Sequence, residues 1–124
     1  MVMQEAGEMY LETILRIQEE QGYVRSIDVA NRMGYSKPTI SEQMKKFREA
    51  GLVSFDDEMH INLTPKGSRI AKKTYERHVA ITSFLETIGV SPVTAENDAC
   101  RFEHYISDET FNCMKAFAKE HKPQ

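Results

Sequence analysis

Three residues near the end of the sequence carry side chains that commonly bind divalent transition metals. Cys100, Glu103 and His104 offer a thiolate, a carboxylate and an imidazole, the three common protein ligands of such ions. They stand at positions i, i+3 and i+4 of a segment predicted to be helical, so the three side chains should project from one face. Burying a carboxylate and an imidazole beside a thiol is costly unless something pairs them. The spacing therefore favours a metal site, although each residue alone is more typical of core or surface.

Other chemistry-bearing residues are scattered along the chain. Met9 and Glu12 lie at i and i+3 of the first predicted helix, and His78 lies on a long central helix. Cys100 has a second interpretation, as the redox-sensing thiol of a regulator that needs no metal. The sequence shows no nucleophile–base set, glycine-rich phosphate loop or zinc-protease motif. We therefore expect no enzyme, no catalytic residues and no small organic substrate.

The elements that must position these residues are mostly helices. Apolar spacing and capping residues predict helices over 7–21, 26–33, 36–50, 64–88, 94–105 and 108–118. Between the third and fourth, the segment 52–63 alternates around the polar tip Asp56-Asp57-Glu58, which indicates a short hairpin. A helix, short helix, tight turn, helix and two-stranded wing make up a winged helix-turn-helix. The predicted fold is mainly α, with this motif at the N-terminus.

The second helix of the predicted helix-turn-helix has a polar face suited to DNA. Small hydroxyl and basic side chains lie near its N-terminus, where base contacts are usually made. Hydroxyls bond base edges or phosphates, and a thymine methyl can pack on Pro38 or Thr39. The opposite face, Ile40, Met44 and Phe47, is predicted to point inward. The predicted DNA-binding residues are Arg25, Ser36, Lys37, Pro38, Thr39, Ser41, Glu42, Lys45 and Lys46, with further phosphate contacts from Lys66, Arg69 and Lys72.

Charge is distributed unevenly along the chain. The 124 residues carry a net charge of −3, yet the segment 23–73 is basic and both flanks are acidic. A basic block can meet a polyanion, although solvated helix faces produce the same pattern. The acidic hairpin tip argues against insertion into the minor groove. A winged helix used only for protein contacts is the alternative to DNA binding.

Composition also limits the location of the protein. No apolar run approaches the length of a membrane span, and the first five residues lack the pattern of a signal peptide. The two cysteines imply no disulfide framework. We therefore expect a cytoplasmic protein with no membrane association.

Short motifs along nearly the whole chain carry a family resemblance. They are Glu8-Met9-Tyr10-Leu11-Glu12, Ser36 to Ser41 with its Pro38-Thr39 pair, Leu63-Thr64-Pro65-Lys66-Gly67, Arg77-His78, Asp98-Ala99-Cys100-Arg101-Phe102-Glu103-His104 and Ser107-Asp108-Glu109. Together they resemble the diphtheria-toxin-repressor family of metal-dependent transcriptional repressors. The length resembles the short branch of that family, and the expectation is that the SH3-like domain of longer members is absent.

The resemblance implies a homodimer that binds a double-stranded DNA operator when loaded with metal, and represses metal-uptake genes. Residues 1–72 would form the winged helix-turn-helix DNA-binding domain, and residues 73–124 a helical metal-binding and dimerisation domain. Met9 and Glu12 of the first helix would contribute to the metal site. Dimer contacts would come from apolar residues of the last two helices, such as Phe102, Ile106, Phe111, Met114 and Phe117.

By position, the resemblance implies an activating site of Met9, Cys100, Glu103 and His104, the ligand set of the iron-responsive branch. The manganese branch has carboxylates in place of Met9 and Cys100. Because sulfur ligands prefer softer ions, Fe(II) is favoured and Mn(II) comes next.

The resemblance also implies a second, adjacent ion, which would give one or two ions per subunit. Glu12 and His78 match ligands of the manganese branch, but Thr82 and Glu96 replace ancillary ligands of the iron branch. We expect His78 to act with Glu96 or Glu12. Glu42 replaces an amide side chain common at that point of the recognition helix, which would shift operator preference.

Overall fold

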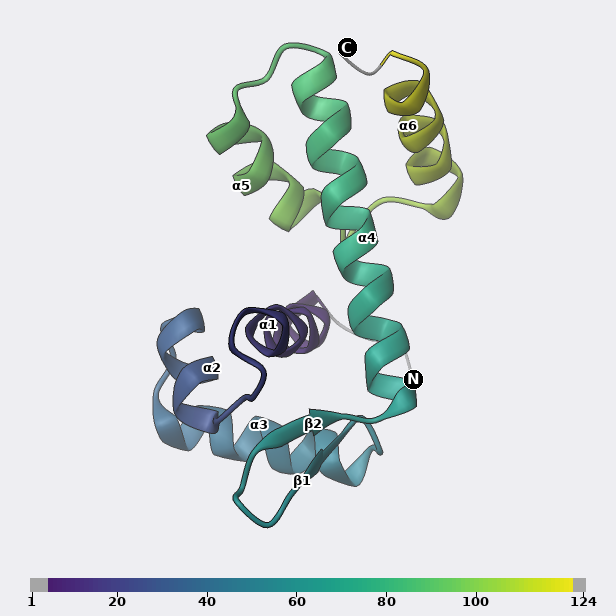
Figure 1. Cartoon of the computed structure of the whole chain (residues 1–124). Helices are drawn as coiled ribbons and strands as arrows, with labels where there is room; N and C mark the ends of the chain where they lie inside the picture. The colour runs from purple at the N-terminus through teal and green to yellow at the C-terminus, as the bar shows by residue number, and fades with distance from the viewer. Residues whose placement is uncertain (1–4, 122–124) are drawn as a thin grey trace. The chain divides into compact units, whose positions relative to one another are not determined.

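The computed structural model describes residues 5–121 as six helices and one hairpin (Figure 1). It divides into two compact units, with the boundary between Lys72 and Lys73. The first unit contains α1 (Glu5–Gln21), α2 (Ser26–Met33), α3 (Lys37–Glu49), β1 (Val53–Phe55), β2 (Ile61–Leu63) and the first turns of α4 (Pro65–Thr87). The second contains the rest of α4, α5 (Pro92–Phe102) and α6 (Asp108–Glu120).

These elements confirm the mainly α fold with an N-terminal winged helix-turn-helix. The functional assignment of residues 1–72 and 73–124 stays a prediction, and residues 1–4 and 122–124 of those ranges lie outside the described part. Within that part, no helix is long and apolar enough to cross a membrane.

Local capping signals set the boundaries of the helix-turn-helix. The backbone of α2 ends at Gly34, whose φ of 74° is the left-handed conformation that glycine adopts most easily. Ser36 then caps α3, because its hydroxyl oxygen accepts a hydrogen bond from the backbone N–H of Thr39. Pro38 occupies the first turn, where its missing N–H costs no hydrogen bond.

The wing is a two-stranded antiparallel hairpin. Val53 pairs with Leu63, and Phe55 pairs with Ile61. At its tip, one carboxylate oxygen of Asp56 accepts backbone hydrogen bonds from Glu58 and His60, each at 2.9 Å. This carboxylate therefore orders the backbone of the hairpin tip.

A close backbone contact joins the wing to the start of α4 within the first unit. Thr64 donates its hydroxyl proton to the Gly51 carbonyl at 2.6 Å and accepts from the Gly67 N–H at 3.1 Å. A Cβ built on Gly67 would lie 2.0 Å from the Leu52 carbonyl oxygen. No side chain fits there, so this contact requires glycine.

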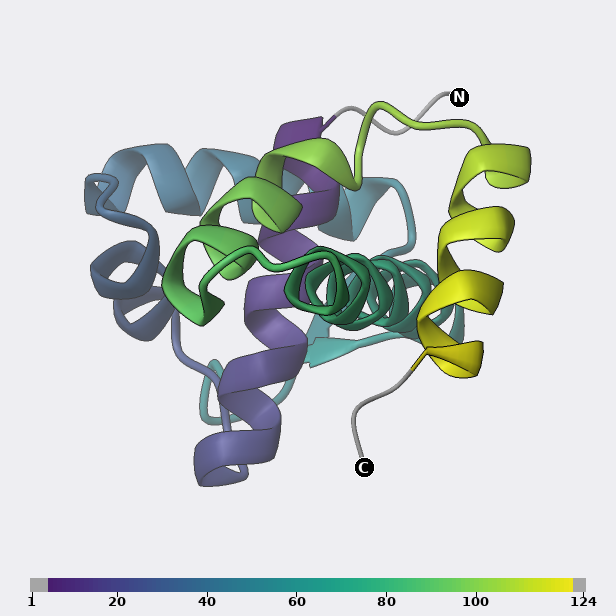
Figure 2. The same ribbon diagram turned by 90° about the horizontal axis from the view of Figure 1, so that it is seen from above.

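The second unit packs α5 and α6 on either side of the later turns of α4, as Figures 1 and 2 both show. Its core consists of Ile81, Ala99 and Met114, surrounded by half-buried apolar side chains that include Phe84, Leu85, Ile106 and Phe111. This packing corrects the predicted dimer surface. Met114 is 9% exposed and serves the core of its own subunit, whereas Phe102 and Phe117 remain exposed.

Candidate metal centre and DNA-binding face

The helix that carries the predicted ligand triad is shorter than its sequence suggested. The expected helix over 94–105 begins at Pro92 and ends at Phe102. Glu103 is its C-cap residue, and Tyr105 donates to the Phe102 carbonyl in a tight turn. The predicted end of this helix was therefore wrong, because Glu103 and His104 occupy the turn between α5 and α6. Glu103 still has helical dihedral angles and donates its backbone N–H to the Ala99 carbonyl.

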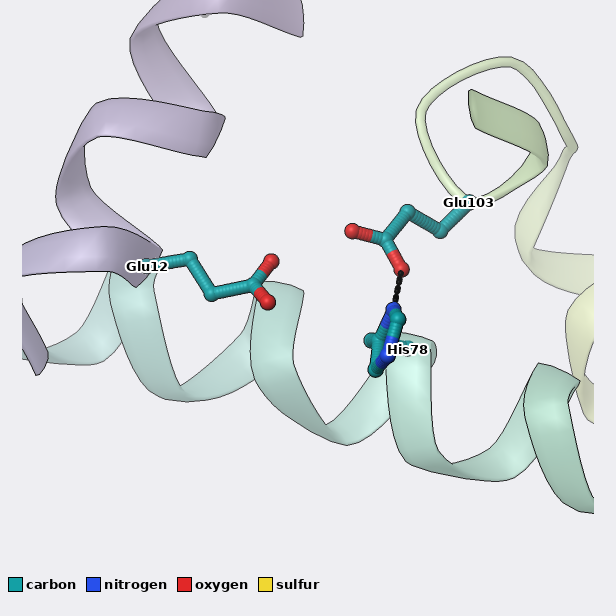
Figure 3. A group of neighbouring side chains, drawn as sticks. All are labelled: Glu12, His78 and Glu103. Atoms are coloured by element: carbon teal, nitrogen blue, oxygen red, sulfur yellow. Dashed lines mark hydrogen bonds and ion pairs between the residues drawn. The ribbon is translucent and has the colours of Figure 1, made fainter. Parts of the chain in front are cut away.

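Glu103 nevertheless forms the centre of a buried cluster in the second unit. Its side chain is 2% exposed, and one carboxylate oxygen lies 3.1 Å from Nδ1 of His78 on α4 (Figure 3). The other carboxylate oxygen lies 3.3 Å from Nε2 of His104, whose side chain is 1% exposed. One carboxylate thus bridges two imidazoles that are far apart in the sequence.

Cys100 and Glu96 reach His78 from α5. The Cys100 sulfur lies 3.7 Å from Nδ1 of His78, on the same side as Glu103. An oxygen of Glu96 lies 3.9 Å from Nε2, the other ring nitrogen. The carboxylate of Glu96 is mostly exposed, in contrast to the buried Glu103. The two nitrogens of His78 therefore face two different carboxylates.

The side chains of this cluster offer donor atoms of the kinds that divalent transition ions bind. Its donor set comprises nitrogen, sulfur and oxygen atoms, a mixture typical of such ions. Ligand bonds of about 2.0–2.3 Å place neighbouring donor atoms about 3–4 Å apart. Two contacts share Nδ1 of His78, to Glu103 at 3.1 Å and to Cys100 at 3.7 Å, and both fall in that range. Glu96 lies against the other ring nitrogen, and His104 against the other oxygen of Glu103.

The same contacts alter the acid–base properties of His78. Hydrogen bonds with Cys100 and with Glu103 raise the pKa of His78 to about 10, against the opposing effect of burial. At neutral pH the imidazole therefore carries a proton, which an incoming metal ion must displace.

Met9 and Glu12 lie one turn apart on α1, in the first unit. Met9 is 36% exposed, so it does not fill the core. A carboxylate oxygen of Glu12 lies 2.7 Å from the Arg16 guanidinium one turn later.

The predicted DNA-reading residues of α3 form a continuous exposed face. Lys37, Pro38, Thr39, Ser41, Glu42, Lys45 and Lys46 are all exposed. The opposite face is buried, with Ile40, Met44 and Phe47 each at most 5% exposed. The helix thus presents the side that carries basic and hydroxyl groups.

Two of the predicted DNA contacts already have partners within the chain. Arg25 is exposed, but its guanidinium binds both carboxylate oxygens of Asp28 and helps to cap α2. The Ser36 hydroxyl bonds both the backbone and the side chain of Thr39. Arg25 and Ser36 therefore order the reading helix and its neighbour in addition to any contact with DNA.

Both halves of the chain match one family. Residues 2–61 match the N-terminal DNA-binding domain of the iron-dependent repressors, and residues 64–123 match their metal-binding and dimerisation domain. The transcriptional regulator MntR of Salmonella typhimurium is 36% identical over 112 residues, which cover 90% of this chain and 71% of that protein. The chain belongs to the iron-dependent repressor family. It is a transcriptional regulator of this metal-dependent type and not an enzyme.

A further relative and two solved structures extend the similarity. An uncharacterized HTH-type transcriptional regulator of Methanocaldococcus jannaschii is 33% identical over 122 residues, 97% of this chain and 98% of that protein. A solved manganese-dependent transcriptional repressor in complex with manganese is 31% identical, with a TM-score of 0.83 over 90% of this chain. The manganese regulator SloR is 28% identical, with a TM-score of 0.78 over 96% of this chain. This chain spans 52% and 55% of those two structures, about half their length.

One residue of this repressor's second unit was given no role by the sequence. The Arg77-His78 pair was visible as a motif, but only the histidine had metal chemistry. Arg77 donates to the backbone carbonyls of Glu103 and Ile106 and pairs with Asp108. These partners lie 26 to 31 residues away, a separation at which sequence spacing carries no signal.

Proposed function

We propose that this chain is a homodimeric repressor of metal-uptake genes, acting in the cytoplasm, which binds its double-stranded operator when loaded with Fe(II). Mn(II) is the second candidate ion. The observation that carries the proposal is the cluster of the buried His78, Glu103 and His104 side chains with the half-buried Cys100, in a chain whose other unit is a winged helix-turn-helix.

The activating ion is proposed to bind Met9, Cys100, Glu103 and His104. A thioether and a thiolate favour a borderline or soft ion, whereas Mn(II) favours oxygen ligands and lies lowest in the usual affinity order. Cys100 and Glu103 both contact Nδ1 of His78, at 3.7 Å and 3.1 Å, so the sulfur lies on the same side of that imidazole as the Glu103 carboxylate. The two similar solved structures, the manganese regulator SloR and the manganese-dependent repressor, support Mn(II) instead. For this reason the test below ranks both ions.

A second ion, if bound, would use Glu12, His78 and Glu96. His78 faces Glu103 through one ring nitrogen and Glu96 through the other. Its imidazole can therefore contribute to the position of the activating ion or to that of the second ion. Thr82, one turn after His78 on α4, offers only a hydroxyl where the iron branch has a carboxylate. We therefore expect the second ion to bind more weakly than the first.

The proposed mechanism is a shift in population between conformations. A bound ion would link donors on α1 to donors at and just beyond the end of α5. Met9 would contribute from the DNA-binding unit, and Cys100, Glu103 and His104 from the other. Linking them favours one spacing of the two reading helices in the dimer, matched to two operator half-sites. By linkage, the metal must also bind more tightly when operator DNA is present.

Exchange of the two sulfur ligands tests the choice of metal. The double variant Met9→Asp/Cys100→Glu installs carboxylates in place of a thioether and a thiol. Its DNA binding should respond better to Mn(II) relative to Fe(II) than wild type does, while metal-free binding stays weak. The measurement is DNA binding against free metal concentration under anaerobic conditions, with a duplex selected from a random pool by the metal-loaded protein.

Cys113→Ser is the matched control, because it removes an exposed thiol of α6 outside the cluster. It should leave the metal ranking unchanged. If the double variant keeps the wild-type ranking, Met9 and Cys100 are not ligands and the iron assignment is wrong. Binding that responds to oxidant through Cys100 and ignores a chelator would favour the redox-sensor alternative.

A further inference from the structure

The turn that carries Glu103 and His104 lacks the support of a regular helix. Helix α5 ends at Phe102, and α6 does not begin until Asp108. Carbonyl groups beyond a helix end need donors from elsewhere in the chain. Two proposed metal ligands thus lie on a segment whose position depends on tertiary contacts.

Arg77 supplies these contacts. One terminal nitrogen of its guanidinium donates to the Glu103 carbonyl at 3.1 Å and to the Ile106 carbonyl at 3.2 Å. The other terminal nitrogen pairs with the carboxylate of Asp108, the first residue of α6. The guanidinium also lies 5.0 Å from the centre of the Phe111 ring. Only 14% of the Arg77 side chain is exposed.

Because of the position of Arg77 on α4, these bonds connect the turn to the helix that carries His78. It is the residue before His78, and both belong to one continuous helix. A helix backbone is stiff, so a clamp on the Glu103 carbonyl fixes the start of the turn relative to the His78 imidazole. The clamp on Ile106 fixes its end.

We propose that Arg77 is a positioning residue of the metal centre. It holds Glu103 and His104 in place for the ion by bonding the backbone carbonyls of Glu103 and Ile106, which enclose His104. Asp108 orients the guanidinium and joins the first turn of α6 to the same clamp. The inference rests on the proposed metal site. It assigns Arg77 no contact with the ion itself.

The fork of the guanidinium explains why an arginine stands here. Its planar donors point in fixed directions and serve two carbonyls and a carboxylate together, which a single ammonium group cannot do in the same geometry. Groups that orient metal ligands typically change metal affinity 10- to 100-fold when they are removed.

The test uses Co(II) alone as the probe of the intact chain. Its visible absorption bands depend on the number and geometry of the ligands, so they report ligand position independently of DNA binding. Arg77→Ala should lower Co(II) affinity about 10- to 100-fold and alter the spectrum at saturating Co(II). Arg77→Lys retains the charge and loses the fork, so it should recover only part of the affinity.

Arg101→Ala is the matched control. Arg101 is an exposed arginine in the last turn of α5, beside Cys100, so its removal deletes the same charge near the cluster without breaking the clamp. It should retain the affinity and the spectrum. Asp108→Asn provides a milder change that keeps one acceptor oxygen, and it should shift affinity in the same direction as Arg77→Ala by a smaller factor.

The outcomes separate positioning from simple stabilisation. If Arg77 only stabilised the fold, Arg77→Ala would have a lower thermal unfolding temperature and a wild-type spectrum at saturating Co(II). This result would overturn the proposal. An equal loss of affinity in Arg101→Ala would also overturn it, because the effect would then be one of charge. If Arg77→Ala does not fold, the spectrum of Arg77→Lys decides the question in the same way. Failure of the wild-type chain to bind Co(II) would instead remove the proposed metal site, and the inference with it.

Discussion

The proton carried by His78 gives a quantitative prediction for metal binding. Hydrogen bonds with Cys100 and with Glu103 raise the pKa of His78 to about 10. At pH 7 such an imidazole is almost fully protonated, whereas one with the ordinary pKa of about 6.5 is only about one-quarter protonated. An ion that takes His78 as a ligand, as proposed for the second ion, needs the unprotonated nitrogen, so its binding must release this proton.

The expected effect of the substitution His78→Gln follows directly. Loss of His78 should reduce the protons released per ion at pH 7 by about one, rather than by the quarter expected of an unperturbed histidine. Because binding releases a proton, it is favoured at higher pH. The apparent metal affinity of the wild type therefore rises with pH wherever His78 of the metal-free protein is protonated. That dependence should be shallower in His78→Gln by about one proton.

Calorimetry of Co(II) binding measures proton release directly. Titrations at pH 7 in two buffers of different ionisation enthalpy give the number of protons released. His121→Gln, at an exposed histidine at the end of α6, is the control and should match wild type. A difference of a quarter of a proton or less between wild type and His78→Gln would show that the cluster does not hold the proton on His78, and would refute the reasoning.

Two further predictions concern the DNA-binding unit. Lys37→Ala and Lys45→Ala should weaken DNA binding and flatten its salt dependence by about one unit of slope for each phosphate interaction that is removed. Thr39→Ala should instead change the preference among operator sequences. Wild-type DNA binding in all three variants would show that α3 is not the reading helix. Gly67→Ala should destabilise the chain by about 1–3 kcal/mol in urea unfolding, because the new methyl group meets the Leu52 carbonyl. Wild-type stability would show that the backbone at this contact moves apart without a loss of free energy.

The sequence predicted the fold well where the signals are local. A glycine at the end of α2, a serine cap and a proline in the first turn placed α3 within one residue of its observed start at Lys37. The inward face of Ile40, Met44 and Phe47 followed from helical spacing and is buried as expected. These features depend on neighbours a few residues away, so they can be read from the chain alone.

The features that the sequence could not predict depend on distant partners. The helix over Cys100 ends before Glu103, and the turn that follows bonds to Arg77, 26 residues earlier. The need for glycine at position 67 arises from a backbone carbonyl fifteen positions away in the sequence, at Leu52. Met114 was expected at a dimer surface, but its apolar side chain fills the core of its own subunit. An apolar residue on an amphipathic helix does not reveal which partner will cover it.

The central claim is that metal at this cluster controls DNA binding. The most direct test measures binding of the wild-type protein to its selected duplex after treatment with a chelator, and again during anaerobic titration with Fe(II) or with Mn(II). We predict weak binding without metal, recovery with both ions, and half-maximal recovery at a lower free concentration of Fe(II) than of Mn(II). Binding that is equally tight in the presence of the chelator would contradict the account.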